Sequence, residues 1–224
     1  MLISEAPPLY KSTNQLAKII LRFIVKLEIF GSENFPKEGA VLVVTNHLHW
    51  VDTLVAIAAM PRWSTVLAGE KWAKVPLWSL MLRKSKSVVF INRGKPDRRA
   101  LEQALNILRA GRVFGLAPEG DYSKTRSLQK GHNGAAFLAS RTGVPVVPLV
   151  IYGQEKLFTS LLNLKRPLVR VVFGEAFVLP GTPNLANGKQ LGDYTEEIMR
   201  KLATILPPEY RGVYQEMFDG NSYK

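Results

Sequence analysis

Hydrophobic positions in this chain alternate between short continuous runs and longer stretches with a helical period. The runs are bounded by Gly, Pro or polar residues, and they predict buried strands near residues 41–44, 64–67, 87–92, 113–117, 144–151 and 168–173. Stretches with apolar residues at the i, i+3, i+4 spacing predict helices near residues 53–60, 69–82, 97–110, 131–142 and 191–206. Strands that alternate with helices predict the α/β class, with a central sheet between helical layers.

A further helix is predicted near the N-terminus, over residues 15–30. One face carries large apolar residues, whereas Lys18, Arg22 and Lys26 form a basic stripe. A helix of about 15 residues is about 22 Å long, shorter than the ~30 Å hydrocarbon core of a bilayer. We therefore expect residues 1–30 to form an amphipathic unit that lies on an anionic membrane surface, docks on the domain core, or does both, and residues 31–224 to form the α/β domain.

Charge and composition narrow the classes of partner and of chemistry. The chain of 224 residues has a formal net charge of +12 and an isoelectric point near 10.0, which implies an anionic partner. It has no cysteine, so a disulfide framework, a thiolate nucleophile and a cysteine zinc site are excluded. We find no signal-peptide pattern and no apolar stretch of about 20 residues. Trp63, Trp72 and Trp78 lie among basic residues, where they suit either a membrane interface or the core.

Two prolines interrupt the predicted strand over residues 144–151. Pro145 and Pro148 cannot donate a backbone hydrogen bond, so we expect this strand at an edge of the sheet or locally unpaired.

The candidate chemistry is concentrated where the strand over residues 41–44 meets the following helix. His47 and Asp52 flank this short turn, and Asp52 stands where a helix N-cap is expected. Ligands of open α/β sheets bind at the carboxyl ends of the strands. A carboxylate that accepts a hydrogen bond from one imidazole nitrogen fixes the tautomer, which leaves the other nitrogen as a base.

Four short motifs in order resemble those of the glycerolipid acyltransferase family, which includes 1-acylglycerol-3-phosphate acyltransferase. They cover about the middle half of the chain: Asn46-His47 with Asp52, Phe90-Ile91-x-Arg93, Pro118-Glu119-Gly120, and Val144-Pro145-Val146-x-Pro148. The resemblance implies a mixed sheet within the α/β fold.

The resemblance also implies roles for particular residues. His47 is the general base, Asp52 orients it, and Arg93 binds the acceptor's phosphate. Glu119 and Gly120 position the acceptor or stabilise the oxyanion. The third motif departs from the family pattern, because Asp121 and Tyr122 replace a threonine and an arginine. Lys130, with Lys124 and Arg126 as alternatives, is the candidate for replacing the missing positive charge.

The implied reaction is O-acyl transfer to the free hydroxyl of a lysophospholipid. The donor would be acyl-CoA or an acyl carrier protein, and the acceptor 1-acylglycerol-3-phosphate, which gives phosphatidic acid. Neither a metal nor another cofactor is expected, because the thioester is already activated. The enzyme would be peripheral, on the cytoplasmic face of the cell membrane.

Three alternatives remain open. One is an acyltransferase for another lipid, such as a glycolipid or an amine-bearing lipid, because the third motif departs from the pattern. Another is a hydrolase with a metal held by His47, His49 and Asp52. The third is a basic domain without catalytic activity that binds membrane or nucleic acid. The chain has no recognised nucleic-acid-binding module, so we expect no nucleic-acid partner.

Overall fold

The protein is built on a seven-stranded mixed sheet, described here from a computed structural model that covers residues 6–74, 80, 83–92, 97–180 and 187–219. The strand order is β1-β7-β6-β2-β5-β3-β4. The strands are β1 (Lys26–Phe30), β2 (Val41–Thr45), β3 (Ser64–Gly69), β4 (Val88–Ile91), β5 (Val113–Leu116), β6 (Val146–Tyr152) and β7 (Leu168–Phe173). Neighbouring strands are parallel except β6 and β7, which are antiparallel. The predicted α/β class and mixed sheet are confirmed.

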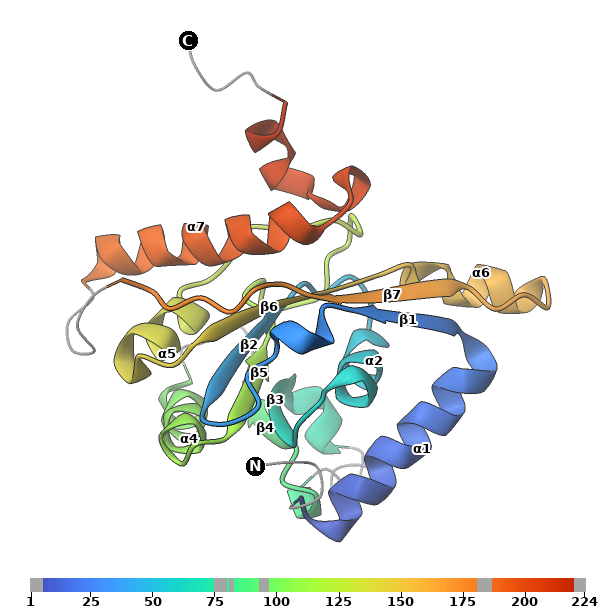
Figure 1. Ribbon diagram of the computed structural model, residues 1–224, viewed down its shortest axis with the longest axis horizontal. Coiled ribbons are helices and arrows are strands. Elements are labelled where there is room, and N and C mark those ends of the chain that lie inside the picture. The colour runs from blue at the N-terminus through green and yellow to red at the C-terminus, as the bar shows by residue number, and fades with distance from the viewer. Residues whose placement is uncertain (1–5, 75–79, 81–82, 93–96, 181–186, 220–224) are drawn as a thin grey trace.

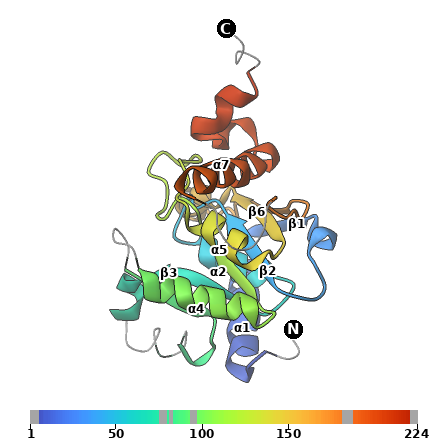
Figure 2. The ribbon, with the colours of Figure 1, turned by 90° about the vertical axis from the view of Figure 1, so that its left-hand side faces the viewer.

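Helices cover both faces of the sheet (Figure 1). The α-helices are α1 (Pro8–Ile24), α2 (Asp52–Ala59), α4 (Arg98–Arg109), α5 (Gly134–Thr142), α6 (Leu157–Leu162) and α7 (Gly188–Ile205). Short 3₁₀ segments are η2 (Ser32–Asn34), η3 (Glu70–Lys74), η4 (Gln154–Lys156), η5 (Pro208–Tyr210) and η6 (Gly212–Met217). Leu42 and Val44 of β2 pack in the core with α4, α5 and α7, which follow one another along one face (Figure 2). Val41 and Val43 point the other way, into the core with α1 and α2.

The prediction of a helix over residues 15–30 is wrong at both ends. The helix α1 begins at Pro8, before the predicted start, and it ends at Ile24. Val25 is extended, and residues 26–30 form the edge strand β1, parallel to β7. Pairing with β7 therefore decides the conformation of this segment against its helical period.

The face of α1 that packs on the domain also differs from the expected one. Tyr10, Asn14, Ala17 and Leu21 are buried, whereas the large apolar residues of the predicted face are exposed. We call these exposed residues the α1 stripe: Leu16, Ile19, Ile20 and Phe23. No helix in the described part of the chain is long and apolar enough to span a membrane.

Of the two alternatives expected for β6, the edge position is wrong, whereas a strand that is locally unpaired at a proline is what the structure has at Pro148. The strand β6 lies between β2 and β7, inside the sheet. The Val146 N–H and the Pro148 carbonyl both bond to the chain that follows β7, at Phe177 and Gly174, so the Pro148 nitrogen faces that same side. Because β7 ends at Phe173, Pro148 stands beyond its end, and the missing N–H removes no bond from the β6–β7 ladder.

Arg62 and Trp63 are buried rather than available to a partner. The Arg62 guanidinium donates to the carbonyls of Pro36 and Gly39, and Trp63 is only 6% exposed. Trp63 packs against Tyr10 and beneath the Arg112 guanidinium, so for this tryptophan the core position holds. Of the helix predicted over residues 69–82, the described part contains η3 and Leu80, and Trp78 lies outside the described residues.

Candidate active site

The turn after β2 meets the turn after β5, because these parallel strands are neighbours and end at the same edge of the sheet. The backbone N–H of His47 donates to Glu119 Oε1 at 2.8 Å. The carbonyl of His47 accepts from the N–H of Ser123 at 2.7 Å. The first and third motifs are therefore held together by two hydrogen bonds through a single residue.

The His47 side chain is paired with Asp52. Its Nδ1 lies 3.0 Å from Asp52 Oδ2, and the same oxygen accepts from the N–H groups of Leu48 and His49 at 2.7 and 2.8 Å. The prediction that Asp52 is the N-cap of the helix is wrong: Asp52 is the first residue of α2, and the N-cap is Val51. The Asp52 carboxylate turns back to the 47–49 turn instead of capping the helix. Since an ionised carboxylate only accepts, Nδ1 of His47 carries the proton and Nε2 is left as the base.

The third strand end at this site is that of β6, on the other side of β2. Gln154, two residues after the end of β6, donates from Nε2 to Asp52 Oδ1 at 2.7 Å and is fully buried. Asn46 bonds through both ends of its amide to the backbone of Ile151, at 2.8 and 2.9 Å, and so extends the β2–β6 pairing by one residue. The role of Gln154 is not predicted from the sequence, although its position after a strand of the sheet was a usable signal.

Glu119 lies buried between the two motifs. Its second carboxylate oxygen accepts from the N–H of Gln129 at 2.8 Å. Burial raises the pKa of Glu119 to about 7, although the hydrogen bonds from His47 and Gln129 act to lower it. Both oxygens thus hold backbone in place, and a contact of Glu119 with the substrate stays a prediction.

Gly120 forms the exposed corner of the same turn. Its φ is +78°, and its N–H donates to the carbonyl of Ala117. A Cβ at this position would lie 3.1 Å from Cδ2 of His132, so the turn favours glycine on both counts. Lys130 is exposed nearby in sequence, and its predicted contact with the acceptor stays a prediction. Arg93 lies outside the described residues.

Aromatic rings surround the turn formed by residues 47–52. The ring of Tyr122 stands edge-on to that of His47, with 6.1 Å between centroids. His49 packs against Trp50 and Phe158, with centroids 5.8 and 5.9 Å away. Burial lowers the pKa of His49. Within the described residues, no group of three or more His, Asp or Glu side chains is placed to hold a metal ion.

Comparison with known proteins shows which family this chain resembles in sequence. The sequence model of a family described as Acyltransferase matches residues 26–152. The 1-acyl-sn-glycerol-3-phosphate acyltransferase of Borreliella burgdorferi is 27% identical over 60% of this chain and 54% of its own length. A probable 1-acyl-sn-glycerol-3-phosphate acyltransferase of Mycoplasma pneumoniae is 37% identical over 65% of this chain and 56% of its own length. The match therefore spans little more than half of these relatives.

A solved structure has the same fold. The crystal structure of the 1-acyl-sn-glycerophosphate acyltransferase PlsC from Thermotoga maritima superposes with a TM-score of 0.66 at 23% identity. The superposition covers 88% of this chain and 79% of that chain.

Proposed function

Because the chain belongs to the acyltransferase family, we propose that it is an O-acyltransferase acting on a lysophospholipid. A fatty acyl group would move from acyl-CoA or an acyl carrier protein to the free hydroxyl of 1-acylglycerol-3-phosphate, giving phosphatidic acid. The observation that carries the proposal is the His47–Asp52 pair, because it provides a base with a defined tautomer at the strand ends.

In the proposed reaction, Nε2 of His47 takes the proton from the acceptor hydroxyl as the oxygen attacks the thioester carbonyl. The buried carboxylate of Asp52 stabilises the imidazolium that forms. Collapse of the tetrahedral intermediate breaks the C–S bond, and the leaving thiolate takes the proton back from His47. The acyl group ends as an ester, and the carrier ends as a free thiol.

The substrates and the membrane follow from the same proposal. Arg93 and Lys130 would bind the acceptor's phosphate, and Glu119 and Gly120 would shape the turn beside it. The α1 stripe, with Lys18 and Arg22 on the same helix, would lie on the anionic cytoplasmic face of the cell membrane as a peripheral contact. No cofactor and no nucleic acid would take part.

One observation favours a second acceptor class. Where the family's third motif has an arginine, this chain has Tyr122, and its ring stands edge-on to His47. A phenol can donate to and accept from a hydroxyl, but it carries no charge for a phosphate at neutral pH. An acceptor without a phosphate, such as a glycolipid or an amine-bearing lipid, is therefore the second candidate.

Acceptor profiling separates the two. Purified protein is given labelled acyl-CoA or acyl carrier protein with 1-acylglycerol-3-phosphate, or with a monoacylglycerol of the same chain. The first candidate predicts faster transfer to the phosphate-bearing acceptor, and Tyr122→Arg should increase that preference. If the monoacylglycerol is acylated and the phosphate-bearing acceptor is inert, the second candidate replaces the first. Transfer to neither, with either donor, would overturn the first candidate.

A further inference from the structure

The helix α6 is seated on the core by Leu157 at its start and ends in an exposed apolar projection. We call Phe158, Leu161, Leu162 and Leu164 the α6 tip. Leu162, the last residue of this six-residue helix, is 84% exposed, and Leu164, just beyond it, is 97% exposed. Single exposed leucines are common, but four large apolar side chains within seven residues form a patch that calls for a partner.

The backbone holds Leu164 outward at a conformational cost. The N–H of Lys165 bonds to the carbonyl of Ser160, and that of Leu164 to the carbonyl of Leu161, which is the Schellman pattern of a helix end. The Schellman pattern has one residue in the left-handed conformation, where glycine is favoured. Here that residue is Leu164, with a φ of +53°. A bulky side chain there is strained and gains no burial from this chain, so a contact outside the chain would account for it.

The charges around the α6 tip select the kind of partner. From Lys156 to Val169 the charged residues are Lys156, Lys165 and Arg166, all basic. Glu155 comes directly before them, and its carboxylate is bound by the Gly153 N–H and the Tyr210 hydroxyl. Leucine and phenylalanine with flanking basic residues are the composition of segments that enter the interface of an anionic bilayer.

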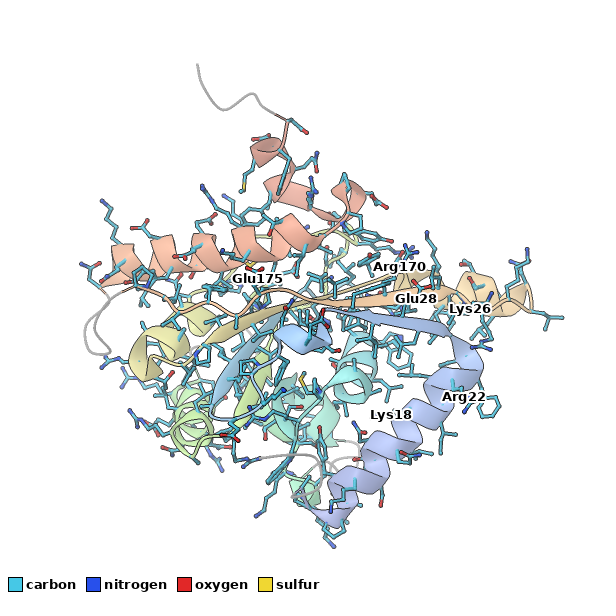
Figure 3. All side chains as sticks on the ribbon, in the orientation of Figure 1. Lys18, Arg22, Lys26, Glu28, Arg170 and Glu175 are labelled. Atoms are coloured by element: carbon cyan, nitrogen blue, oxygen red, sulfur yellow. The ribbon has the colours of Figure 1, made fainter. Side chains whose placement is uncertain are left out.

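The α6 tip is fixed beside the end of α1. Arg166 donates from Nε and Nη2 to the Val25 carbonyl, at 3.2 and 2.8 Å, and the N–H of Lys26 donates to the Pro167 carbonyl at 2.8 Å. Phe23, near this end of α1, is 73% exposed. Figure 1 shows α6 and the C-terminal end of α1 at the same end of the molecule, and Figure 3 places Arg22 and Lys26 there as well.

We propose that the α6 tip is a second membrane anchor, which inserts into an anionic bilayer together with the α1 stripe. The segment before α6 carries Gln154, which bonds to Asp52, and Phe158 contacts His49. Anchoring α6 thus places the turn of residues 47–52 at the bilayer surface. An acceptor lipid can then reach His47 without leaving the interface. This last step rests on the proposed acyl transfer, whereas the anchoring does not.

Binding to vesicles of phosphatidylcholine with about one third phosphatidylglycerol tests the anchor. Leu162→Ser with Leu164→Ser should lower the partition coefficient about tenfold or more, because two exposed leucines leave the bilayer. Val213→Ser, an exposed apolar residue on η6 at a distant part of the molecule, should bind like the wild type (Figure 1). Leu164→Gly should also bind less, yet it should unfold at a higher urea concentration, because glycine relieves the left-handed strain.

The double variant also separates the anchor from the proposed function. With a short-chain acceptor that is monomeric in water, it should transfer acyl groups as fast as the wild type. If the wild type transfers nothing, the proposed function fails, and the vesicle result still decides the anchor. Equal vesicle binding by the double variant and the wild type would overturn the anchor. So would a wild type that is dimeric and a double variant that is monomeric in the absence of lipid, because the tip would then bind a second copy.

Discussion

Asp52→Asn isolates the charge of the carboxylate that holds His47, the proposed base. The carboxylate accepts four hydrogen bonds: three at Oδ2, from His47, Leu48 and His49, and one at Oδ1, from Gln154. An asparagine has one oxygen, and it must take the place of Oδ2, because an NH₂ group there would face three donors. The asparagine NH₂ then faces Gln154.

Gln154 can accommodate this change. Its Oε1 is buried and has no hydrogen-bond partner among the described residues. Turning its amide over brings Oε1 to the new NH₂ group, at the cost of the 3.3 Å contact from Nε2 to the Ile151 carbonyl. We therefore expect the substitution to lower the free energy of unfolding by only about 1–2 kcal/mol. The catalytic loss should be larger, roughly 10²–10⁴-fold in kcat or about 3–5 kcal/mol of barrier, since no charge stabilises the imidazolium.

Steady-state acyl transfer and urea unfolding measure these two effects separately. The KM for the acceptor should change little, because Asp52 is only 2% exposed and does not line the surface that an acceptor would touch. Asp193→Asn, an exposed carboxylate on α7, is the matched control and should keep both kcat and stability. A folded Asp52→Asn protein with kcat within about fivefold of the wild type would refute the role given to this carboxylate.

Two further predictions concern the supports of the site. The folded-state pKa of Glu119, about 7 against an ordinary 4.5, means that the folded protein holds an extra proton between these values. Its contribution to the free energy of unfolding should thus fall by about 3 kcal/mol as pH rises through this range, and urea titrations of Glu119→Gln should lack that fall. Gly153→Ala should unfold at lower urea and lose activity, because its Cβ would lie 2.2 Å from the Leu168 carbonyl oxygen and shift Gln154. Gly192→Ala, within α7 and with open space around it, should instead raise the unfolding midpoint; equal midpoints for both would contradict this packing.

The sequence was sufficient for the six strands from β2 to β7 and for the His47–Asp52 pair. The strand β7 is specified locally by its apolar run. The start of α4 is also specified locally, because the Asp97 side chain accepts a hydrogen bond from the N–H of Ala100, three residues on. The pairing of His47 with Asp52 is local too, because both lie in one turn.

What the sequence could not supply depends on contacts between distant segments. The strand β1 forms because β7, about 140 residues later, offers a free edge, although its own residues continue a helical period. The prolines left an edge strand and a locally unpaired strand open, and only the end of β7 beside Pro148 decides for an unpaired position inside the sheet. Gln154 joins the site only because β6 lies next to β2 in the sheet.

Acyl transfer by the wild type and by His47→Ala is the most direct test of the account. Labelled donor, as acyl-CoA or acyl carrier protein, is mixed with 1-acylglycerol-3-phosphate, and the thermal midpoint of each protein is recorded to show that both are folded. We predict transfer by the wild type and a fall in kcat of at least about 100-fold in the variant, because a general base contributes roughly 10²–10⁴-fold. Equal rates for the two folded proteins would contradict the assignment of His47 as the base on which the proposed function depends.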